Sequence, residues 1–264
     1  MPSPSPSPVD FVVVSPTNDD RTLERCLAAS PEIRSGDVPL RVVREARSAN
    51  NVIADALGRA DRSFVVYAHQ DVYFPAGFFA RLSDALSTLS EQDPTWAVAG
   101  AIGRDAARRT HGTVWSTDRG MVVGERIERA APVECLDECV LIMRAGDLSL
   151  VDLGLPGFHL YGVDLVQMGR LQGRQSYALP LDVVHHAKPI TSLGGGYAQG
   201  HRYVRQKWRA RLPLVTLIAP LERVPWKLWK MRVGVRIRAR FSPARHAYGQ
   251  HSDPRAIARE LSYE

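Results

Sequence analysis

The chain has 264 residues and a formal net charge of +6, and it combines 45% hydrophobic with 23% charged residues. Its length allows one substantial core, and this composition excludes a disordered, fibrous or collagen-like chain. No run of about 18 apolar residues occurs, so we expect no membrane-spanning helix. The cysteines (Cys26, Cys135 and Cys139) lack the spacing of a metal site, and their odd number argues against a disulfide framework. We expect buried free thiols and a reducing, cytoplasmic compartment.

The two ends of the sequence differ from its middle. Residues 1–9 are rich in proline and serine and lack the charged and apolar regions of a signal peptide, so we expect a disordered tail there. Residues 202–245 contain thirteen Lys or Arg and a single acid, Glu222. We therefore expect a catalytic domain at 10–208 and a basic C-terminal appendage at 209–264 that meets an anionic surface.

In the first part of the chain, predicted strands and helices alternate. Apolar runs predict strands at 10–14, 40–43, 64–68 and 96–102, and helical spacing predicts helices at 22–29, 50–60 and 75–89. Such alternation implies parallel strands joined by right-handed crossovers. The sequence thus predicts an α/β fold with a mostly parallel central sheet flanked by helices.

The pattern changes after residue 103. A polar and aromatic stretch at 112–123 predicts a loop or hairpin, and 133–143 predicts a strand that presents carboxylates on one face. A loop from 155 leads to a helix that ends near Leu171, with Gly173 as its stop signal. We expect a last strand at 177–186, which ends in two adjacent histidines, and a mobile glycine loop at 194–196.

Three polar side chains, His69, Gln70 and Asp71, follow the apolar run at 64–68. Ligands of open α/β sheets bind outside the carboxyl ends of the strands, and a carboxylate there, beside an imidazole, can hold a divalent cation against a phosphate. A solvated strand end is the alternative interpretation. Two further clusters at loops or strand ends, His159 with Asp164 and His185 with His186, favour a site, because strand ends on one edge of a sheet converge.

Several motifs occur together in a specific order. They are the Asn18 turn after the first strand, His-Gln-Asp-Val at 69–72, Gly-Ala-Ile-Gly at 100–103, Val-Glu-Cys-Leu-Asp at 133–137, Gly-Phe-His-Leu-Tyr at 157–161, and the late His186. In this order the chain resembles the family 2-type glycosyltransferases of the GT-A fold, in the subgroup named after a streptomycin-biosynthesis protein. The resemblance covers about residues 11–208.

The resemblance implies a nucleotide-sugar donor, such as a UDP-sugar, and a divalent metal, Mn²⁺ or Mg²⁺. The metal ligands would be Asp71 and His186, with His185 as the second choice. The donor contacts would come from the positions that match the donor-binding elements of the family: Ser15, Thr17, Asn18, Asp55, His69, Gln70 and Asp71. Asp55 stands where the family usually has an asparagine, which puts that contact in doubt.

The resemblance also implies an inverting single displacement, in which an acceptor hydroxyl attacks the anomeric carbon. Asp137 lies where the family places a residue near the transferred sugar. Gly162 stands where the family has its catalytic aspartate. Either Asp164 takes over as the base, which is our choice, or His159 does, or activity has been lost. The last case leaves a catalytically silent nucleotide-sugar-binding or scaffold protein. A nucleotidyltransferase ranks lower, since no Gly-rich phosphate loop follows the first strand.

Residues 226–240 interleave tryptophan and aliphatic residues with lysine and arginine. This pattern suits an interfacial helix on anionic lipid, at the inner face of the plasma membrane, where a lipid-linked glycan would be the acceptor. A natural-product acceptor stays equally open. Alternatively, Trp226 and Trp229 pack against the catalytic domain while the charges stay solvated. Nucleic-acid binding ranks third, because no nucleic-acid module accompanies the basic segment.

Overall fold

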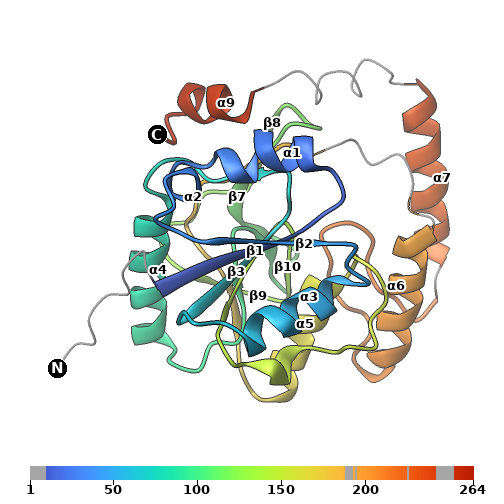
Figure 1. Cartoon of the computed structure of the whole chain (residues 1–264). Coiled ribbons are helices and arrows are strands. Elements are labelled where there is room, and N and C mark those ends of the chain that lie inside the picture. Colours follow the sequence, from blue (N-terminus) through green and yellow to red (C-terminus); the bar gives the residue numbers. More distant parts are fainter. Residues whose placement is uncertain (1–9, 188–192, 194, 225, 242–252) are drawn as a thin grey trace.

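The computed structural model describes residues 10–187, 193, 195–224, 226–241 and 253–264. The tail expected at 1–9, Gly194 of the expected glycine loop and the end of the basic segment at Arg245 lie outside the described residues. Figure 1 shows a central sheet with helices packed around it, and the last helix of the chain lying near the first.

The elements come in the following order. The strands are β1 (Phe11–Thr17), β2 (Leu40–Arg44), β3 (Phe64–Ala68), β4 (Val72–Tyr73), β5 (Ala99–Gly100), β6 (Gly103–Arg104), β7 (Thr110–Ser116), β8 (Met121–Glu125), β9 (Ala131–Val133), β10 (Cys135–Leu136), β11 (Val140–Arg144), β12 (Ser176–Ala178) and β13 (Val184–His185). The α-helices are α1 (Asp20–Arg25), α2 (Pro31–Arg34), α3 (Ala49–Gly58), α4 (Phe78–Gln92), α5 (Tyr161–Leu171), α6 (Gly195–Lys207), α7 (Trp226–Phe241) and α9 (Pro254–Glu260).

The central sheet has the strand order β2-β1-β3-β11-β5-β12-β9. Strands β2, β1, β3, β5 and β12 run in one direction, whereas β11 and β9 run antiparallel to their neighbours. A second sheet has the order β10-β6-β7-β13-β4, with β8 paired to β7. The predicted mixed α/β fold with a largely parallel central sheet is confirmed. The antiparallel β11 inserted beside β3 was not foreseen.

The side chains of β1 point alternately to the two faces of the central sheet, and both faces are covered. Val12 and Val14 belong to one core cluster, with the buried side chains of α3 and α5. Phe11 and Val13 belong to the other, with Leu23 of α1 and the inner face of α4. Because each face meets helices, the strand is apolar at successive positions, as is typical of a strand buried on both sides.

Several predicted elements have different bounds in the structure. The stretch expected as one strand at 133–143 is three short strands, because its backbone serves two sheets: β9 pairs with β12 in the first and β10 with β6 in the second. The strand expected at 177–186 divides in the same way into β12 and β13. The glycine loop expected at 194–196 is wrong for Gly195 and Gly196, which begin α6. The hairpin expected at 112–123 is confirmed as β7 and β8.

The C-terminal segments pack on the rest of the domain. Leu228 and Val235 of α7 belong to the core cluster that contains Val12 of β1, and Ile257 of α9 packs with Tyr73 and Val184. The three cysteines are free and buried, as predicted. Among the described residues, no helix combines the length and the apolar character needed to cross a bilayer.

Candidate metal and donor site

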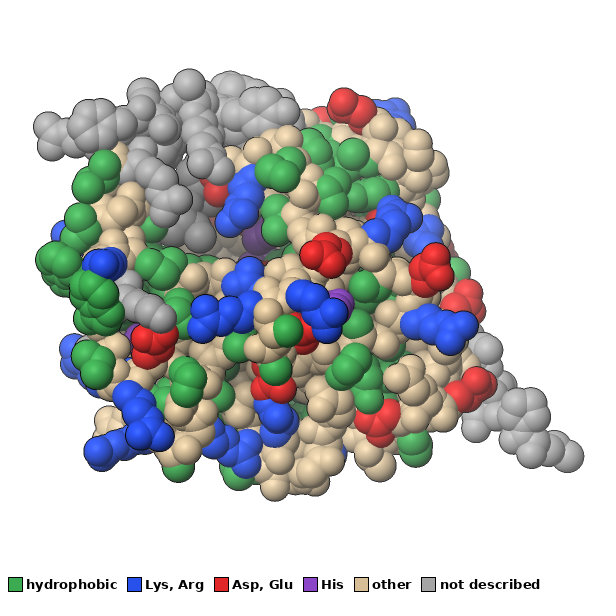
Figure 2. All heavy atoms as spheres, turned by 180° about the vertical axis from the view of Figure 1, so that it is seen from behind, with side chains coloured by type: hydrophobic (Ala, Val, Ile, Leu, Met, Phe, Trp, Pro, Cys, Tyr) green, Lys and Arg blue, Asp and Glu red, His purple; other side chains and the backbone are tan. Residues whose placement is uncertain are grey.

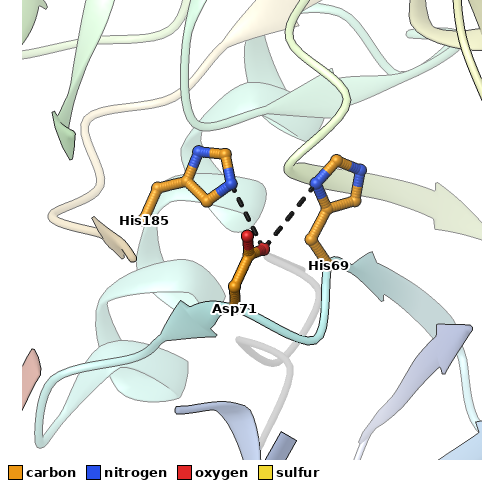
Figure 3. Close-up of side chains that lie close together, drawn as sticks. All are labelled: His69, Asp71 and His185. Carbon is orange, nitrogen blue, oxygen red and sulfur yellow. Dashed lines mark ion pairs between the residues drawn. The ribbon is translucent and has the colours of Figure 1, made fainter. Parts of the chain in front are cut away.

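The candidate site lies at the carboxyl end of β3, where two sheets meet. His69 directly follows β3, and its backbone N–H donates to the Cys139 carbonyl at 2.9 Å, which holds it beside the turn before β11. Asp71 precedes β4, and β13 pairs antiparallel with β4, so that His185 lies opposite Val72. Figure 3 shows the imidazoles of His69 and His185 on either side of the Asp71 carboxylate.

The three side chains form a compact donor set. His185 Nε2 lies 3.2 Å from Asp71 Oδ1, and His69 Nδ1 lies 4.0 Å from the same oxygen. One ligand atom from each residue falls within 4.8 Å of the others. The side chains of His69, Asp71 and His185 keep 31%, 21% and 20% of their surface exposed, so a small ligand can reach them.

Tyr161 sets the orientation of His69. Its hydroxyl donates to the Glu138 carbonyl at 3.0 Å and lies 2.7 Å from His69 Nε2. Since a tyrosine hydroxyl has only one proton to donate, it must accept from His69, which assigns the proton of the neutral ring to Nε2. The lone pair of Nδ1 then faces Asp71. Metal-binding histidines are held in this way, with the other ring nitrogen donating to a fixed acceptor.

The charges of the cluster are coupled. Burial would raise the pKa of Asp71, but the neighbouring His185 and His69 lower it overall. Burial would lower the pKa of His185, and the Asp71 carboxylate outweighs this and raises it. Burial lowers the pKa of His69 and outweighs the attraction of Asp71. The Asp71 carboxylate therefore favours the protonated form of His185, whereas burial favours the neutral form of His69.

This donor set fits a divalent cation that accepts imidazole nitrogen. Two ring nitrogens and one carboxylate oxygen suit ions such as Mn²⁺, Fe²⁺ or Zn²⁺, whereas Mg²⁺ prefers oxygen alone. The prediction of a metal site around Asp71 therefore has a matching cluster in the structure. That cluster uses the second-choice histidine, His185.

His186 lies apart from the cluster. Its backbone N–H donates to the Asp71 carbonyl at 2.7 Å, but its ring is buried and lies 3.3 Å from the Thr117 hydroxyl. Successive side chains of a strand point to opposite faces, so only one of two adjacent histidines can reach the Asp71 carboxylate. The structure therefore brings His185, the second choice, to the Asp71 carboxylate and places the ring of His186, the first choice, at Thr117.

The residues after β1 form a polar clamp with the loop after β3. Gln70 Oε1 accepts from the Thr17 hydroxyl at 2.5 Å and from the backbone N–H groups of Asn18 and Asp19 at 3.0 and 3.2 Å, and Gln70 Nε2 donates to Asn18 Oδ1 at 2.8 Å. Asn18 remains exposed. Ser15 is fully buried, and its hydroxyl donates to the adjacent Pro16 carbonyl at 3.4 Å. The structure thus places Thr17, Asn18 and Gln70 together beside the cluster and leaves Ser15 below the surface.

Asp55 makes its ion pair within its own helix. It lies on the exposed face of α3 and pairs with Arg59 at 2.8 Å, one turn further along the helix. The buried face of α3 contains Ala49, Asn50 and Val52 instead. Helical periodicity thus places Asp55 on the solvent side of α3, and a donor contact from it stays a prediction.

Asp164 lies inside the protein. Its side chain is fully buried, Trp208 Nε1 donates to its Oδ1 at 2.7 Å, and Lys207 Nζ donates to its Oδ2 at 2.9 Å. Burial raises the pKa of Asp164, and Lys207 and Trp208 act against this rise. Lys207 also donates to Asp152 Oδ2 at 2.6 Å. We call Asp152, Asp164, Lys207 and Trp208 the Asp164 cluster. Since both Asp164 oxygens are held inside, no acceptor hydroxyl can meet them, which speaks against Asp164 as the base.

The other predicted catalytic residues lie nearer the metal cluster. Asp137 occupies the turn before β11, where its Oδ1 accepts from the Cys139 N–H at 2.9 Å. The ring of His159 lies 5.4 Å from that of Tyr197 on α6, and burial lowers the pKa of His159. Both residues act on His69 electrostatically: Asp137 raises the pKa of His69, and His159 lowers it.

The sequence analysis missed Glu138 as a site residue. Its Oε1 accepts from the Gly162 N–H at 3.4 Å, at the first turn of α5. A Cβ at position 162 would lie 2.6 Å from the Leu136 carbonyl and 3.2 Å from Glu138 Cγ. Burial, reinforced by Asp137, raises the pKa of Glu138 to about 8. The Glu138 side chain thus approaches the backbone of a residue that has no side chain of its own. The acids at 137 and 138 and the glycine at 162 are visible in the sequence, but their contact is not.

No protein-family model matches the chain. The chain is 30% identical to the product of the ATP synthase subunits region ORF 6 of Fuscovulum blasticum over 161 residues, which are 60% of this chain and 64% of that protein, just under two thirds of its length.

Similar solved structures include the mannosyltransferase PcManGT from Pyrobaculum calidifontis in complex with GDP-Man and Mn²⁺, with a TM-score of 0.44 and 16% identity over 98% of this chain and 81% of that one. TarS residues 1–349 from S. aureus has a TM-score of 0.45 and 15% identity over 88% and 72% of the chains. A197 from STIV has a TM-score of 0.39 and 13% identity over 64% and 81%. Similarities at this level assign no function to the chain.

Proposed function

We propose that this protein is a metal-dependent glycosyltransferase of the GT-A type, which moves a sugar from a nucleoside-diphosphate donor to an acceptor hydroxyl. The observation that carries the proposal is the cluster of His69, Asp71 and His185 at the carboxyl end of β3. In open α/β sheets this edge is where ligands bind. The motifs at 69–72 and 157–161, which resemble those of family 2 enzymes, contribute His69, Asp71 and Tyr161 to this one place.

Each part of the site has a role in the proposal. Asp71, His69 and His185 would hold the divalent ion, which when bound neutralises negative charge on the leaving diphosphate. Tyr161 keeps the Nδ1 lone pair of His69 directed at the ion site. The clamp of Gln70 on the loop after β1 fixes the surface on which the nucleoside would lie, with Asn18 as its exposed edge.

The proposed base is Glu138. It is the carboxylate that lies against Gly162, where the family resemblance leads one to expect an aspartate. With a pKa of about 8, the ionised fraction of Glu138, which grows as the pH rises above neutral, is a stronger base than a carboxylate of ordinary pKa. His159, whose lowered pKa keeps it neutral, is the second candidate. Glu138→Gln and His159→Gln separate the two, since only the substitution of the true base should abolish transfer while donor binding persists.

Turnover of a nucleotide-sugar panel with Mn²⁺ tests the proposal, with release of nucleoside diphosphate as the readout. The isosteric Asp71→Asn variant should lose at least about a hundredfold in metal-dependent turnover or donor hydrolysis, about 2.7 kcal/mol of transition-state stabilisation. Asp105→Asn is the matched control. Asp105 also contacts a histidine, His111, at 2.9 Å, but among the ion pairs of the described residues His111 is the only imidazole that it meets.

The result that contradicts the metal assignment is full activity of the Asp71 variant. Donor binding without turnover across many acceptors would instead indicate a silent nucleotide-sugar-binding or scaffold protein, with Gly162 as the sequence feature behind the loss.

A second candidate function follows from the donor set itself. Two histidines and one carboxylate with open positions are also the ligands of non-haem Fe²⁺ oxygenases. Anaerobic titration with Fe²⁺ and with Mn²⁺, followed by oxygen-uptake measurements, distinguishes the two functions. Preference for Fe²⁺ with oxygen consumption in the presence of a co-substrate would favour the oxygenase. Nucleotide-sugar binding that depends on Mn²⁺ would favour the transferase.

A further inference from the structure

Helix α7 has apolar side chains on two opposite faces. Leu228 and Val235 face inward, each with 9% of its surface exposed, and Met231 packs beside them against the main core. These three positions recur at the helical spacing of three and four residues, so they form one face. This inner face packs the helix onto the domain.

The opposite face of α7 is apolar but exposed. Trp226, Trp229, Val233 and Ile237 keep 50%, 63%, 39% and 52% of their surface accessible. Their spacing of three, four and four residues places them in one line along the helix, which we call the outer stripe. The two tryptophans are therefore not packed against the catalytic domain, which excludes that interpretation of their role. Isolated exposed apolar residues need no explanation, but a continuous line of them on one helix does.

Basic side chains border the outer stripe on both sides. Lys230 lies next to it, with its ammonium 3.8 Å from the centre of the Trp226 ring, and Arg236 and Arg232 follow the other border. Lys230 and Arg236 are exposed. Glu222 is the only acid between residues 202 and 245. Figure 2 shows hydrophobic side chains gathered along the left edge of the molecule, over α7, with blue side chains among them.

We propose that α7 lies flat on an anionic lipid surface, with the outer stripe in the headgroup region and the flanking cations on the lipid charges. Tryptophan is favoured at this depth of a bilayer, and clustered Lys and Arg are attracted to acidic headgroups. The inner face keeps the domain attached to the bound helix. This inference stands on α7 alone and does not rest on the proposed transferase activity.

Two other occupants of the outer stripe fit less well. Nucleic acid would use tryptophans for stacking and cations for phosphates, but it offers no partner to Val233 and Ile237. A second copy of this chain would bring the same cations face to face, because a two-fold contact sets like patches against each other.

Vesicle sedimentation of the whole chain, without donor or metal, tests the inference. Vesicles of equal parts phosphatidylcholine and phosphatidylglycerol should bind the protein, and vesicles of phosphatidylcholine alone should bind it much less. Trp226→Ala with Trp229→Ala should weaken binding by about tenfold or more. Both side chains are exposed, so the fold should persist, which circular dichroism checks. Leu153→Ala with Leu171→Ala, two leucines exposed on other elements, is the matched control and should bind as the wild type does.

A second pair of variants tests the role of charge. Lys230→Glu with Arg236→Glu should abolish the preference for anionic vesicles, and 1 M NaCl, which reduces the range of charge interactions to about 3 Å, should weaken wild-type binding. Equal binding of the tryptophan variant and the wild type would overturn the proposal. So would a concentration-dependent dimer that the tryptophan variant abolishes, or tight oligonucleotide binding in the absence of vesicle binding.

Discussion

The metal cluster (His69, Asp71 and His185) and the Asp164 cluster each centre on an aspartate, but the two aspartates differ in how far their hydrogen-bonding capacity is filled. In each, an aspartate is held by nitrogen atoms of neighbouring side chains. Asp71 is partly exposed, and the Nδ1 lone pair of His69 points toward it without a proton between them. Asp164 is fully buried, and both of its oxygens already accept hydrogen bonds from Lys207 and Trp208.

The difference shows what separates a binding site from a structural one. A buried carboxylate with all its partners in place joins elements of the fold, here α5 to the end of α6. A partly open carboxylate with spare lone pairs around it can exchange a proton-bearing partner for an ion or a ligand. An aspartate is present in both clusters, so its residue type does not distinguish them, and substitutions in each cluster test whether the distinction is real.

The largest expected effect is on stability, in the Asp164 cluster. Asp164→Ala leaves the buried Trp208 N–H and one donor position of Lys207 without an acceptor, so we expect a loss of about 2–4 kcal/mol in the free energy of unfolding. Urea denaturation measures this. Asp55→Ala, which breaks an exposed pair with Arg59, is the control and should change stability by about 0.5 kcal/mol or less.

The structural role of the Asp164 cluster is contradicted if Asp164→Ala has the same free energy of unfolding as the wild type but no longer turns over a nucleotide-sugar. That result would return Asp164 to the reaction, in the role that the sequence suggested for it.

The next largest expected effect is on metal affinity. It should differ between alanine variants of the two adjacent histidines, His185 and His186. His185→Ala removes a nitrogen ligand, and since even the loss of an outer partner of a metal ligand costs about 10–100-fold in affinity, we expect at least that loss for Mn²⁺. His186→Ala should leave Mn²⁺ affinity within about twofold, because its ring faces Thr117. Isothermal titration of the folded variants measures both. Equal losses for the two would show that β13 presents either histidine to Asp71.

The smallest effect concerns Glu138 and pH. Burial raises the pKa of Glu138 from 4.5 to about 8, so the folded state holds this proton more tightly than the unfolded chain. Stability is therefore highest below the unfolded pKa and falls as pH rises toward about 8. Glu138→Gln should reduce this fall by about 1–2 kcal/mol, in urea denaturation at about pH 5 and about pH 8.5. Glu91→Gln, on the surface of α4, is the control and should leave the pH dependence as it is.

Much of the fold could be predicted from the sequence, because apolar runs and helical spacing are local signals. The strand at 64–68 has the predicted bounds, and β2, α3 and the hairpin at 112–123 lie within a few residues of theirs. The bounds of the short strands β9 to β13 could not be predicted, because each strand ends where it leaves one of two sheets. Which sheet a strand joins depends on pairing with residues far away in the sequence, and a local pattern does not contain that information.

The candidate site could be predicted in part, because some of its residues lie next to local sequence signals. His69 and Asp71 follow directly from the end of a buried strand. The choice between His185 and His186 depends on the strand alternation of β13, which two residues do not reveal. Glu138 became visible only once α5 brought Gly162 against it. The enclosure of Asp164 by Lys207 and Trp208 could not be predicted, because its position in the motif carries no information about these partners.

The strand that carries His185 is short and is held from outside the central sheet. Val184 packs with Tyr73 and with the side chains of α9, and the Tyr73 hydroxyl donates to the Glu264 carboxylate at 2.5 Å. During synthesis, His69 and Asp71 therefore leave the ribosome long before the segments that bring and secure the third member of the cluster. In a nascent chain the candidate cluster therefore stays incomplete until β13 pairs with β4, and α9, which packs against that pair, is made last.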